Sequence, residues 1–571
     1  MPFIAPADEI RFLLEHVSGF TALRNSDTFD ATDNETVQAI LSEAGALCDG
    51  ALAPLQRIGD MEPARLENGV VRTSPGFAEA YKQIADGGWV GMIASPDYGG
   101  MGLPTALGMA VHEMMSGACL SLQLNPMLTQ GQIVALQAHA SDTLKDTYLP
   151  KLISGKWSGT MNLTEPQAGS DVGAVRTKAE PNGDGTYAIT GQKIYITWGD
   201  SDVTENVIHL VLARLPDAAP GTKGISLFLV PKLLPKDDGT PGERNDLRVV
   251  SLEHKLGIHG SPTAVMEYSG AKGWLVGPEN GGMAAMFTMM NDARLGVAMQ
   301  GIGVAEAAFQ HATAYAAERK QGATGGDTGT IIEHPDVRRM LAWMKARITA
   351  ARAVSLACAS AFDMAKATRD AAWEARGAFI TPIAKAFGTQ TGIAVSDLGV
   401  QVHGGMGFIE ETGAAQFLRD VRITSIYEGT NGIQSMDLVG RKLRDGGEVA
   451  FALIDEMAQN AEAARTRFPD LSEKLWSASE DLREATEWMV SQPNPDDRFA
   501  GSLSYLMAFG LTLGAHYHLL AAATEASPGP RTALARTFIL RQLPEHTALL
   551  AEATLGGDDL FAITPEALGV A

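Results

Sequence analysis

The order of apolar patterns along the chain predicts an α+β protein with an N-terminal helical domain, a central antiparallel β domain, a helical bundle and an extra C-terminal helical domain. Three observations support this fold class. Helical spacing dominates up to about residue 158, short turn-separated apolar runs follow it, and long helical patterns return near residue 281. The expected domains are 1–158, 159–280, 281–440 and 441–571.

The individual elements follow from the period of the apolar residues. In the first region, helices are expected at 36–55, 74–85 and 105–121. Short apolar runs bounded by Gly, Pro, Asn and Asp predict strands at 187–190, 193–197, 207–212 and 225–230. Since no helical pattern separates these strands, an antiparallel barrel or sandwich is favoured. Later helices are expected at 293–319, 335–366, 373–402, 432–444 and 448–467.

Composition excludes several classes of function. The chain has 571 residues, enough for several domains that each bury a core, and its 45% hydrophobic content is ordinary for a soluble globular protein. A formal net charge of −22 argues against binding nucleic acid or an anionic membrane, because contacts to phosphates need clustered Lys and Arg. An anionic small ligand is still compatible with this charge where local cations and helix N-termini bind it.

The cysteines and the apolar segments point to a cytoplasmic protein. Cys48, Cys119 and Cys358 are far apart and lack metal-ligand spacing, so reduced, buried thiols and no metal are expected. The N-terminus lacks the basic and apolar segments of a signal peptide. Leu503–Ala523 is the best candidate for a membrane span, but its Tyr, Gly and His residues favour a packed core helix.

The segment Ile426–Asn431 contains the most informative carboxylate of the chain, Glu428. It lies between a tyrosine and a glycine, just before a helical pattern that begins near Gly432. A carboxylate that projects from such a loop into an apolar pocket would have a raised pKa, which suits a general base near neutral pH. The alternative is a glutamate that only stabilises a helix N-terminus.

Two upstream segments have the composition of a ligand-binding wall. In Thr164–Asp171, Pro166 and Gly169 predict a turn whose free N–H groups and hydroxyls could cradle a phosphate or a polar ring edge. The alternative is an ordinary Pro/Gly turn. Ile194–Gly199 could form the wall behind a flat ring, or simply a core strand with a polar end.

Other candidates have simpler interpretations. Arg294 and Arg319 lie on one long helical segment and could be solvated surface charges. The methionines at 283, 286, 289 and 290 indicate core packing rather than a cofactor-binding site. Gly301-Ile302-Gly303 lies inside a helical pattern and does not follow a strand, so it is rejected as a dinucleotide-binding loop.

Taken together, these segments resemble the acyl-CoA dehydrogenase family, a group of FAD enzymes. The resemblance covers roughly residues 75–440, and the helical, β, helical order of the chain is also similar to that of the family. It is specific as a set of motifs rather than through any single one. The motifs are Leu163–Asp171, Gly191–Thr197, Ala317–Lys320, Gln401–Phe408 and Tyr427–Thr430.

The resemblance implies a role for each residue that matches a family motif. Glu428 would be the catalytic base that removes the α-proton, with Gly429, Ser170, Asn291 and Arg294 binding the acyl-CoA substrate. FAD would be bound by residues from both halves of the chain, and Arg319, Gln401, Gly404 and Gly405 would reach the FAD of a neighbouring subunit. The FAD set is Leu163, Thr164, Gly169, Ser170, Ile196, Thr197, Arg319, Gln401, Gly404, Gly405 and Thr430.

The implied reaction is the α,β-dehydrogenation of an acyl-CoA thioester to the trans-2-enoyl-CoA. Glu428 would take the α-proton while a hydride leaves the β-carbon for the flavin, and an electron-transfer flavoprotein would accept the electrons. Tyr195 stands where many members have tryptophan. The alternatives are an acyl-CoA oxidase that passes electrons to oxygen, and a non-catalytic acyl-CoA-binding protein, against which the carboxylate at Glu428 counts.

Several departures from the short members resemble a longer subgroup of the family. They include the Gly-rich loop Gln321–Gly329, the segment Lys255–Thr263 and about 130 residues after the helix that follows Glu428. In that subgroup the extra helical region covers a surface that short members use for tetramer packing, so a homodimer is expected. The resemblance to this subgroup also implies 3-methylmercaptopropionyl-CoA, in dimethylsulfoniopropionate breakdown, as the substrate. Medium- or long-chain fatty acyl-CoA of β-oxidation is the alternative.

Overall fold

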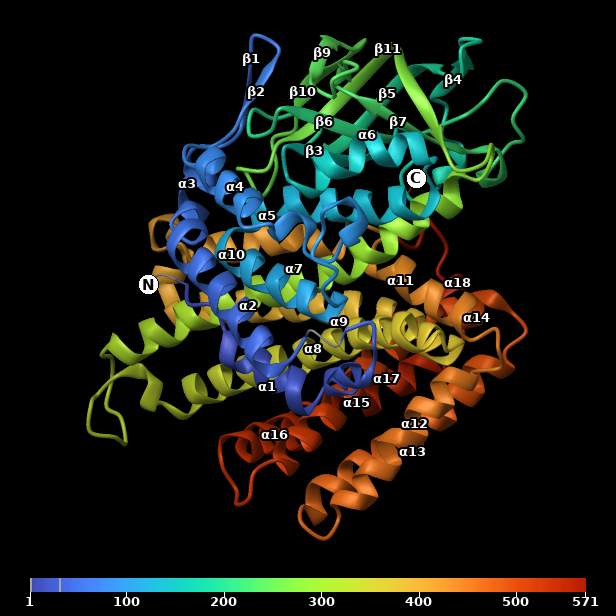
Figure 1. The fold of residues 1–571 in the computed structure, drawn as a ribbon. Coiled ribbons are helices and arrows are strands. Elements are labelled where there is room, and N and C mark those ends of the chain that lie inside the picture. Colours follow the sequence, from blue (N-terminus) through green and yellow to red (C-terminus); the bar gives the residue numbers. More distant parts are fainter. Residues whose placement is uncertain (1–2, 30–31, 571) are drawn as a thin grey trace.

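The computed structural model describes residues 3–29 and 32–570, so Met1, Pro2, Asp30, Ala31 and Ala571 lie outside it. A β sheet forms one end of the molecule, long helices cross its middle, and the C-terminal helices form the opposite end (Figure 1). The order helices, sheet, helical bundle and further helices confirms the predicted fold class.

The N-terminal region is helical with one small hairpin. Its long helix α5 extends well beyond the predicted 105–121 and is buried over most of its length. It is broken at Cys119, whose φ of −158° and ψ of 88° are not helical. The hairpin β1–β2 was not predicted. The elements are α1 Ala7–His16, α2 Asn34–Leu47, α3 Leu55–Met61, β1 Arg65–Glu67, β2 Val70–Arg72, α4 Phe77–Asp86, α5 Thr105–His139 and α6 Asp142–Ile153.

The central sheet has seven strands in the order β3-β6-β7-β11-β5-β4, with β10 paired to β11. Every pair is antiparallel except β3 and β6, which are parallel and buried on both faces. The parallel pair corrects the purely antiparallel expectation. The strands are β3 Trp157–Asn162, β4 Lys178–Pro181, β5 Tyr187–Thr197, β6 Asn206–Ala213, β7 Ser226–Pro231, β8 Leu233–Pro235, β9 Pro241–Arg244, β10 Leu247–Leu252 and β11 Thr263–Val276.

The middle of the molecule is a bundle in which α7 packs against α5 and α9, and α9 against α8. Glycines allow this close packing. A Cβ added at Gly301 would lie 2.6 Å from the carbonyl oxygen of Gly388, and one at Gly303 would lie 2.4 Å from that of Glu113. Gly301 and Gly303 are therefore packing residues of a helix. The helices are α7 Gly282–Glu318, α8 Pro335–Thr368, α9 Ala371–His403, α10 Ala414–Val421 and α11 Asn431–Asp437.

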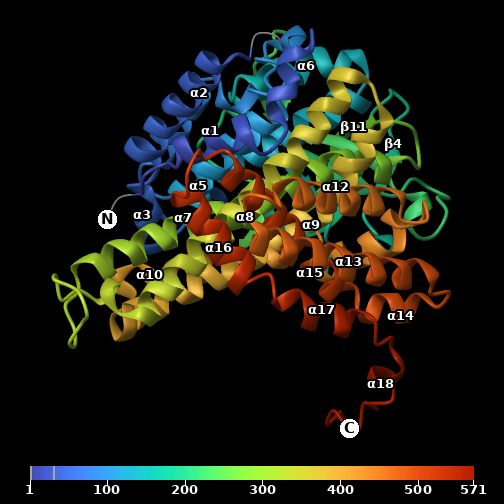
Figure 2. The same ribbon diagram turned by 90° about the horizontal axis from the view of Figure 1, so that it is seen from below.

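The C-terminal helices cover α8 and α9, as the view from below shows (Figure 2). By length and composition α8 and α15 could each cross a membrane, but 83% of the apolar window of each is buried inside the protein. Leu503–Ala523 thus belongs to a core helix. The helices are α12 Glu448–Ala464, α13 Pro469–Ser491, α14 Pro495–Ala500, α15 Ser502–Ala523, α16 Pro530–Arg541, α17 Glu545–Ala553 and α18 Asp558–Phe561.

Candidate active site

Glu428 lies in a tight loop immediately before α11. Its φ is +56° and that of Gly429 is +85°. A left-handed φ is uncommon for a residue with a side chain, and such strain clusters at functional sites. Thr430 begins the helix, because its hydroxyl oxygen accepts a hydrogen bond of 3.1 Å from the N–H of Ile433. The loop is therefore fixed on its C-terminal side by a helix cap.

The electrostatics of this loop suit a proton acceptor. Burial raises the pKa of Glu428 to about 7, against the opposing effect of Arg294 and Lys385. Among the described residues, no donor forms a hydrogen bond with its carboxylate. Lys385 of α9 donates to the carbonyl oxygen of Gly429 at 2.9 Å and to Asn431 at 3.0 Å. Burial lowers the pKa of Lys385 to about 7. Sequence analysis missed Lys385, which stands alone in an apolar helix.

Arg294 of α7 borders the same loop. Its side chain is only 6% exposed and forms an ion pair of 3.5 Å with Asp437 of α11. It also donates to the side-chain oxygen of Asn291 at 3.4 Å, and Asn291 itself is exposed. Arg294 is thus a buried cation beside the candidate base, which argues against a solvated surface charge.

The loop that follows β3 is held by a buried ion pair. Lys193 of β5 lies 2.8 Å from Glu165 and donates to the carbonyl oxygen of Leu163 at 2.9 Å. Glu165 also accepts hydrogen bonds from the N–H and the hydroxyl of Thr177. Burial opposes ionisation of Glu165, but Lys193 and these hydrogen bonds hold its pKa at about 2. Neither partner of this pair was predicted, since their positions in the sequence give no sign that they meet.

The loop that follows β3 (residues 163–171, the held loop) and the end of β5 form one surface. The N–H of Ile194 donates to the carbonyl oxygen of Thr164 at 2.9 Å, which joins the two segments. Ile196 is buried, Thr197 is half-buried, and the side chain of Tyr195 is 62% exposed. Within the part of the chain that the structure describes, the hydroxyls of Thr164, Ser170 and Thr197 form no hydrogen bond. They are therefore available to a ligand.

The four residues expected to reach a neighbouring subunit lie elsewhere. Arg319 directly follows α7, 25 residues after Arg294, which corresponds to about 37 Å along the helix. It is exposed, as are Gln401, Gly404 and Gly405 at the end of α9. A Cβ added at Gly404 or Gly405 would meet no atom within 4 Å. One chain alone therefore does not bring this set to Glu428.

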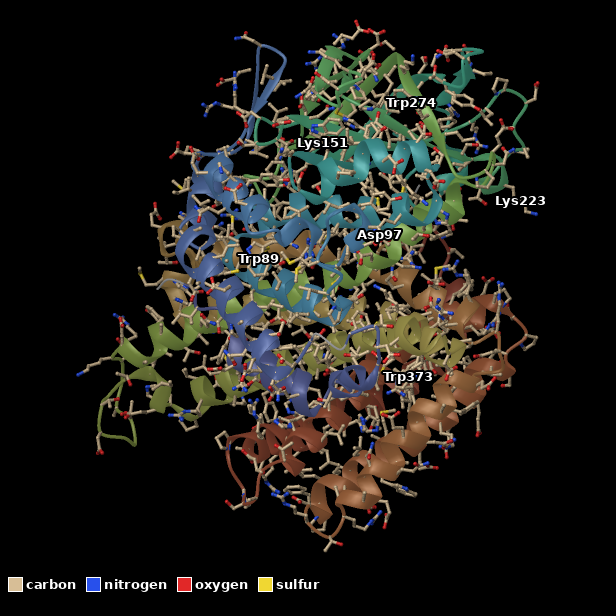
Figure 3. The ribbon with its side chains drawn as sticks, viewed as in Figure 1. Trp89, Asp97, Lys151, Lys223, Trp274 and Trp373 are labelled. Carbon is tan, nitrogen blue, oxygen red and sulfur yellow. The ribbon has the colours of Figure 1, made fainter. Side chains whose placement is uncertain are left out.

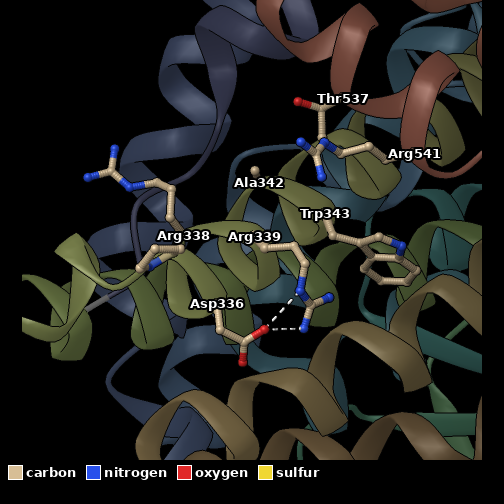
Figure 4. A pocket seen from close by; sticks show the side chains of 8 residues that line it. Asp336, Arg338, Arg339, Ala342, Trp343, Thr537 and Arg541 are labelled. Atoms are coloured by element: carbon tan, nitrogen blue, oxygen red, sulfur yellow. Dashed lines mark hydrogen bonds and ion pairs between the residues drawn. The ribbon is translucent and has the colours of Figure 1, made fainter.

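A cavity of about 900 Å³ lies between the start of α8 and α16 (Figure 4). One of its three arginines, Arg339, is paired with Asp336 at 2.7 Å. It contains none of the predicted site residues. The lining consists of Pro335, Asp336, Arg338, Arg339, Ala342, Trp343, Thr537 and Arg541.

Comparison with known proteins shows the family. Residues 34–156, 160–271 and 280–443 match the N-terminal, middle and C-terminal domains of acyl-CoA dehydrogenase, and residues 451–564 match a domain described as acetyl-CoA dehydrogenase C-terminal like. A 3-methylmercaptopropionyl-CoA dehydrogenase of Ruegeria pomeroyi is 45% identical, over 98% of this chain and 99% of its own.

Solved structures have the same fold. An acyl-CoA dehydrogenase from Bacillus anthracis complexed with FAD has a TM-score of 0.77 at 21% identity, over 97% of this chain and 93% of its own. A chain from a study of the electron transferring flavoprotein of Acidaminococcus fermentans has a TM-score of 0.60 at 27% identity, over 71% of this chain and 97% of its own. The family expected from the motifs is thus confirmed: the chain belongs to the acyl-CoA dehydrogenase family, enzymes that dehydrogenate acyl-CoA thioesters.

Proposed function

We propose that this enzyme converts 3-methylmercaptopropionyl-CoA to methylthioacryloyl-CoA, with FAD as cofactor and Glu428 as the base. The observation that carries the base assignment is the Glu428 loop, in which a carboxylate with a pKa of about 7 lies free of hydrogen-bond donors beside two cations. The substrate assignment is supported by the 45% identity, over nearly the whole of both chains, with an enzyme named for that thioester.

The residues around the held loop and β5 fit a flavin. Three hydroxyls in this region, those of Thr164, Ser170 and Thr197, form no hydrogen bond with the described residues. Gly169 adds open space, since a Cβ there would meet no atom within 4 Å. With Leu163, Ile196 and Thr430 these residues would hold FAD. When bound, the flavin supplies the acceptor for the hydride that leaves the β-carbon of the substrate.

The chain's own residues would then perform the proton chemistry. Glu428 takes the α-proton, and a pKa of about 7 lets it do so near neutral pH. Within the described ranges, the backbone N–H groups of Glu428 and Gly429 form no hydrogen bond, so they can donate to the thioester carbonyl oxygen as negative charge develops there. Arg294 and Asn291 would bind the CoA portion.

We further propose that the enzyme is a cytoplasmic homodimer that passes its electrons to an electron-transfer flavoprotein. The exposed set at the far end of α7 supports a dimer, because Arg319, Gln401, Gly404 and Gly405 are open to contact by a second copy. Beside them Phe408 is 86% exposed and Met406 is 47% exposed, and burial of these side chains against a second copy would be favourable.

Anaerobic flavin absorbance during titration with butyryl-CoA, octanoyl-CoA and 3-methylmercaptopropionyl-CoA tests this function. We expect acyl-CoA thioesters that are substrates to bleach the oxidised flavin band. Bleaching should be fastest with 3-methylmercaptopropionyl-CoA. Faster bleaching by octanoyl-CoA would instead identify a fatty acyl-CoA dehydrogenase. Hydrogen peroxide formed in air without an added acceptor would identify an oxidase, and a protein that binds no FAD would contradict the cofactor.

A further inference from the structure

A line of buried polar side chains runs from the base loop into the core. The hydroxyl of Tyr427 forms a hydrogen bond with the side-chain oxygen of Gln300 on α7. The amide nitrogen of Gln300 donates to the side-chain oxygen of Gln123 on α5 at 3.1 Å. Gln123 and Gln300 are wholly buried among apolar helices. Buried amides in such a core are costly unless they are satisfied, so this arrangement calls for a reason.

The line continues to the other half of α5. The amide nitrogen of Gln123 lies 2.6 Å from Nδ1 of His112, and Nε2 of His112 forms a hydrogen bond with the side-chain oxygen of Gln130. The amide nitrogen of Gln130 donates to the backbone carbonyl oxygen of Trp89 at 2.9 Å. Trp89, labelled in Figure 3, lies in the turn between α4 and α5.

The backbone carbonyl at the end fixes the direction of every bond in this line. It can only accept, so Gln130 must present its nitrogen there and its oxygen to His112. His112 is neutral, because burial lowers its pKa, so it donates from Nε2 and accepts at Nδ1 from Gln123. Gln123 then accepts from Gln300, and Gln300 accepts from Tyr427. All donors thus point away from Glu428.

Two strained places in the backbone are joined by this line. His112 and Gln123 lie on opposite sides of the helix break at Cys119, whose φ and ψ are not helical. Tyr427 precedes Glu428, whose φ is +56°. A satisfied polar network in a low-dielectric core is specific in geometry, and it can hold conformations that the backbone alone would not keep.

We propose that Gln300 is a positioning residue. Through this line of hydrogen bonds, all of which run in one direction, it holds Tyr427 and thereby fixes the left-handed backbone of Glu428. The proposal rests on the assignment of Glu428 as base. Because the hydroxyl hydrogen of Tyr427 is committed to Gln300, that hydroxyl does not donate to the carboxylate, which stays free to accept the α-proton. The same line of hydrogen bonds also connects the Glu428 loop to the helix break in α5.

A double-mutant cycle on the FAD-loaded enzyme tests this proposal. Gln300→Leu and Tyr427→Phe should each lower kcat for 3-methylmercaptopropionyl-CoA by about 10- to 100-fold, with KM changed by less than about threefold and FAD content retained, since each breaks the same bond. The double variant should be no slower than the slower single variant, because the two side chains act through one interaction. Gln132→Leu removes another buried amide of α5, one without a partner in the described structure, and should leave kcat unchanged.

Three outcomes would overturn the proposal: wild-type kcat in both single variants, losses that multiply in the double variant, or an equal loss in Gln132→Leu. Tyr427→Phe keeps the aromatic packing, so it still decides the question if Gln300→Leu fails to fold. Failure of the proposed function would look different. In that case the wild-type flavin itself would not bleach with any acyl-CoA, or Glu428→Gln would bleach as fast as the wild type.

Discussion

The two ends of α7 contrast sharply in their surroundings. Near its start, Arg294 is buried, paired with Asp437 and next to the Glu428 loop, which Lys385 holds from α9. Just beyond its end, about 37 Å away, Arg319 is exposed and has no ion pair among the described residues. One helix thus carries a buried, paired arginine near its start and is followed by an exposed arginine just beyond its end.

This difference between the two ends bears on the proposed homodimer. At the base end Arg294 is paired with Asp437, and a helix cap fixes the C-terminal side of the Glu428 loop. At the far end His403 stacks on His311, with ring centroids 4.6 Å apart, beneath glycines that face open space. An uncovered surface with exposed apolar side chains such as Phe408 is suited to contact with another molecule.

Removing the proposed base, Glu428, should have the largest effect. We expect Glu428→Gln to keep FAD and bind acyl-CoA yet reduce the rate of flavin bleaching by at least about 10³-fold, because the amide cannot take the α-proton. Stopped-flow absorbance of the oxidised flavin band measures this rate. Glu411→Gln, at an exposed glutamate, is the matched control and should be unaffected. Bleaching by Glu428→Gln at close to the normal rate would mean that another residue is the base.

The far end can be tested by subunit complementation. Arg319→Glu should lose FAD and activity by itself, and mixing it with Glu428→Gln in one refolded or co-expressed preparation should restore roughly a quarter of wild-type activity. Half of the dimers would be mixed, and one of the two sites in each would contain an intact base and an intact arginine. If the mixture stays inactive, or light scattering shows a monomer with full FAD, the two ends do not share a site across a dimer.

Much of this contrast could be predicted from the sequence. The period of the apolar residues predicted the order of domains, because it depends only on local spacing. The Tyr-Glu-Gly-Thr motif singled out Glu428 for the same reason. Arg319 and the far-end glycines could be predicted as parts of motifs, while the distance of Arg319 from the Glu428 site followed only from the unbroken length of α7.

The remaining features depend on contacts between distant segments. Lys385 lies 43 residues before Glu428 in an apolar helix, so only the packing of α9 brings it to Gly429. The pairing of β3 with β6 joins strands separated by β4 and β5, and no local pattern specifies it. The line of hydrogen bonds from Tyr427 to Trp89 links four segments of the protein. In the sequence, its side chains look like ordinary polar residues on a helix surface.

The smallest expected effect concerns the charge balance at the base end. Glu428 accepts a proton only as a carboxylate, and its raised pKa of about 7 predicts that the rate of flavin reduction rises between pH 6 and 8 with a midpoint near 7. Lys385 favours the charged form, so Lys385→Met should move this midpoint upward and lower the rate at pH 7 by about tenfold. Its removal also frees the carbonyl oxygen of Gly429.

Lys442→Met is a suitable control for this last change, because Lys442 is a cation near Asp437 but forms no hydrogen bond with the Glu428 loop. It should leave the midpoint close to that of the wild type. A pH profile that Lys385→Met leaves unchanged would show that burial alone sets the pKa of Glu428. The base end would then resemble the far end in one respect, since its neighbouring cation would contribute to packing and not to the chemistry.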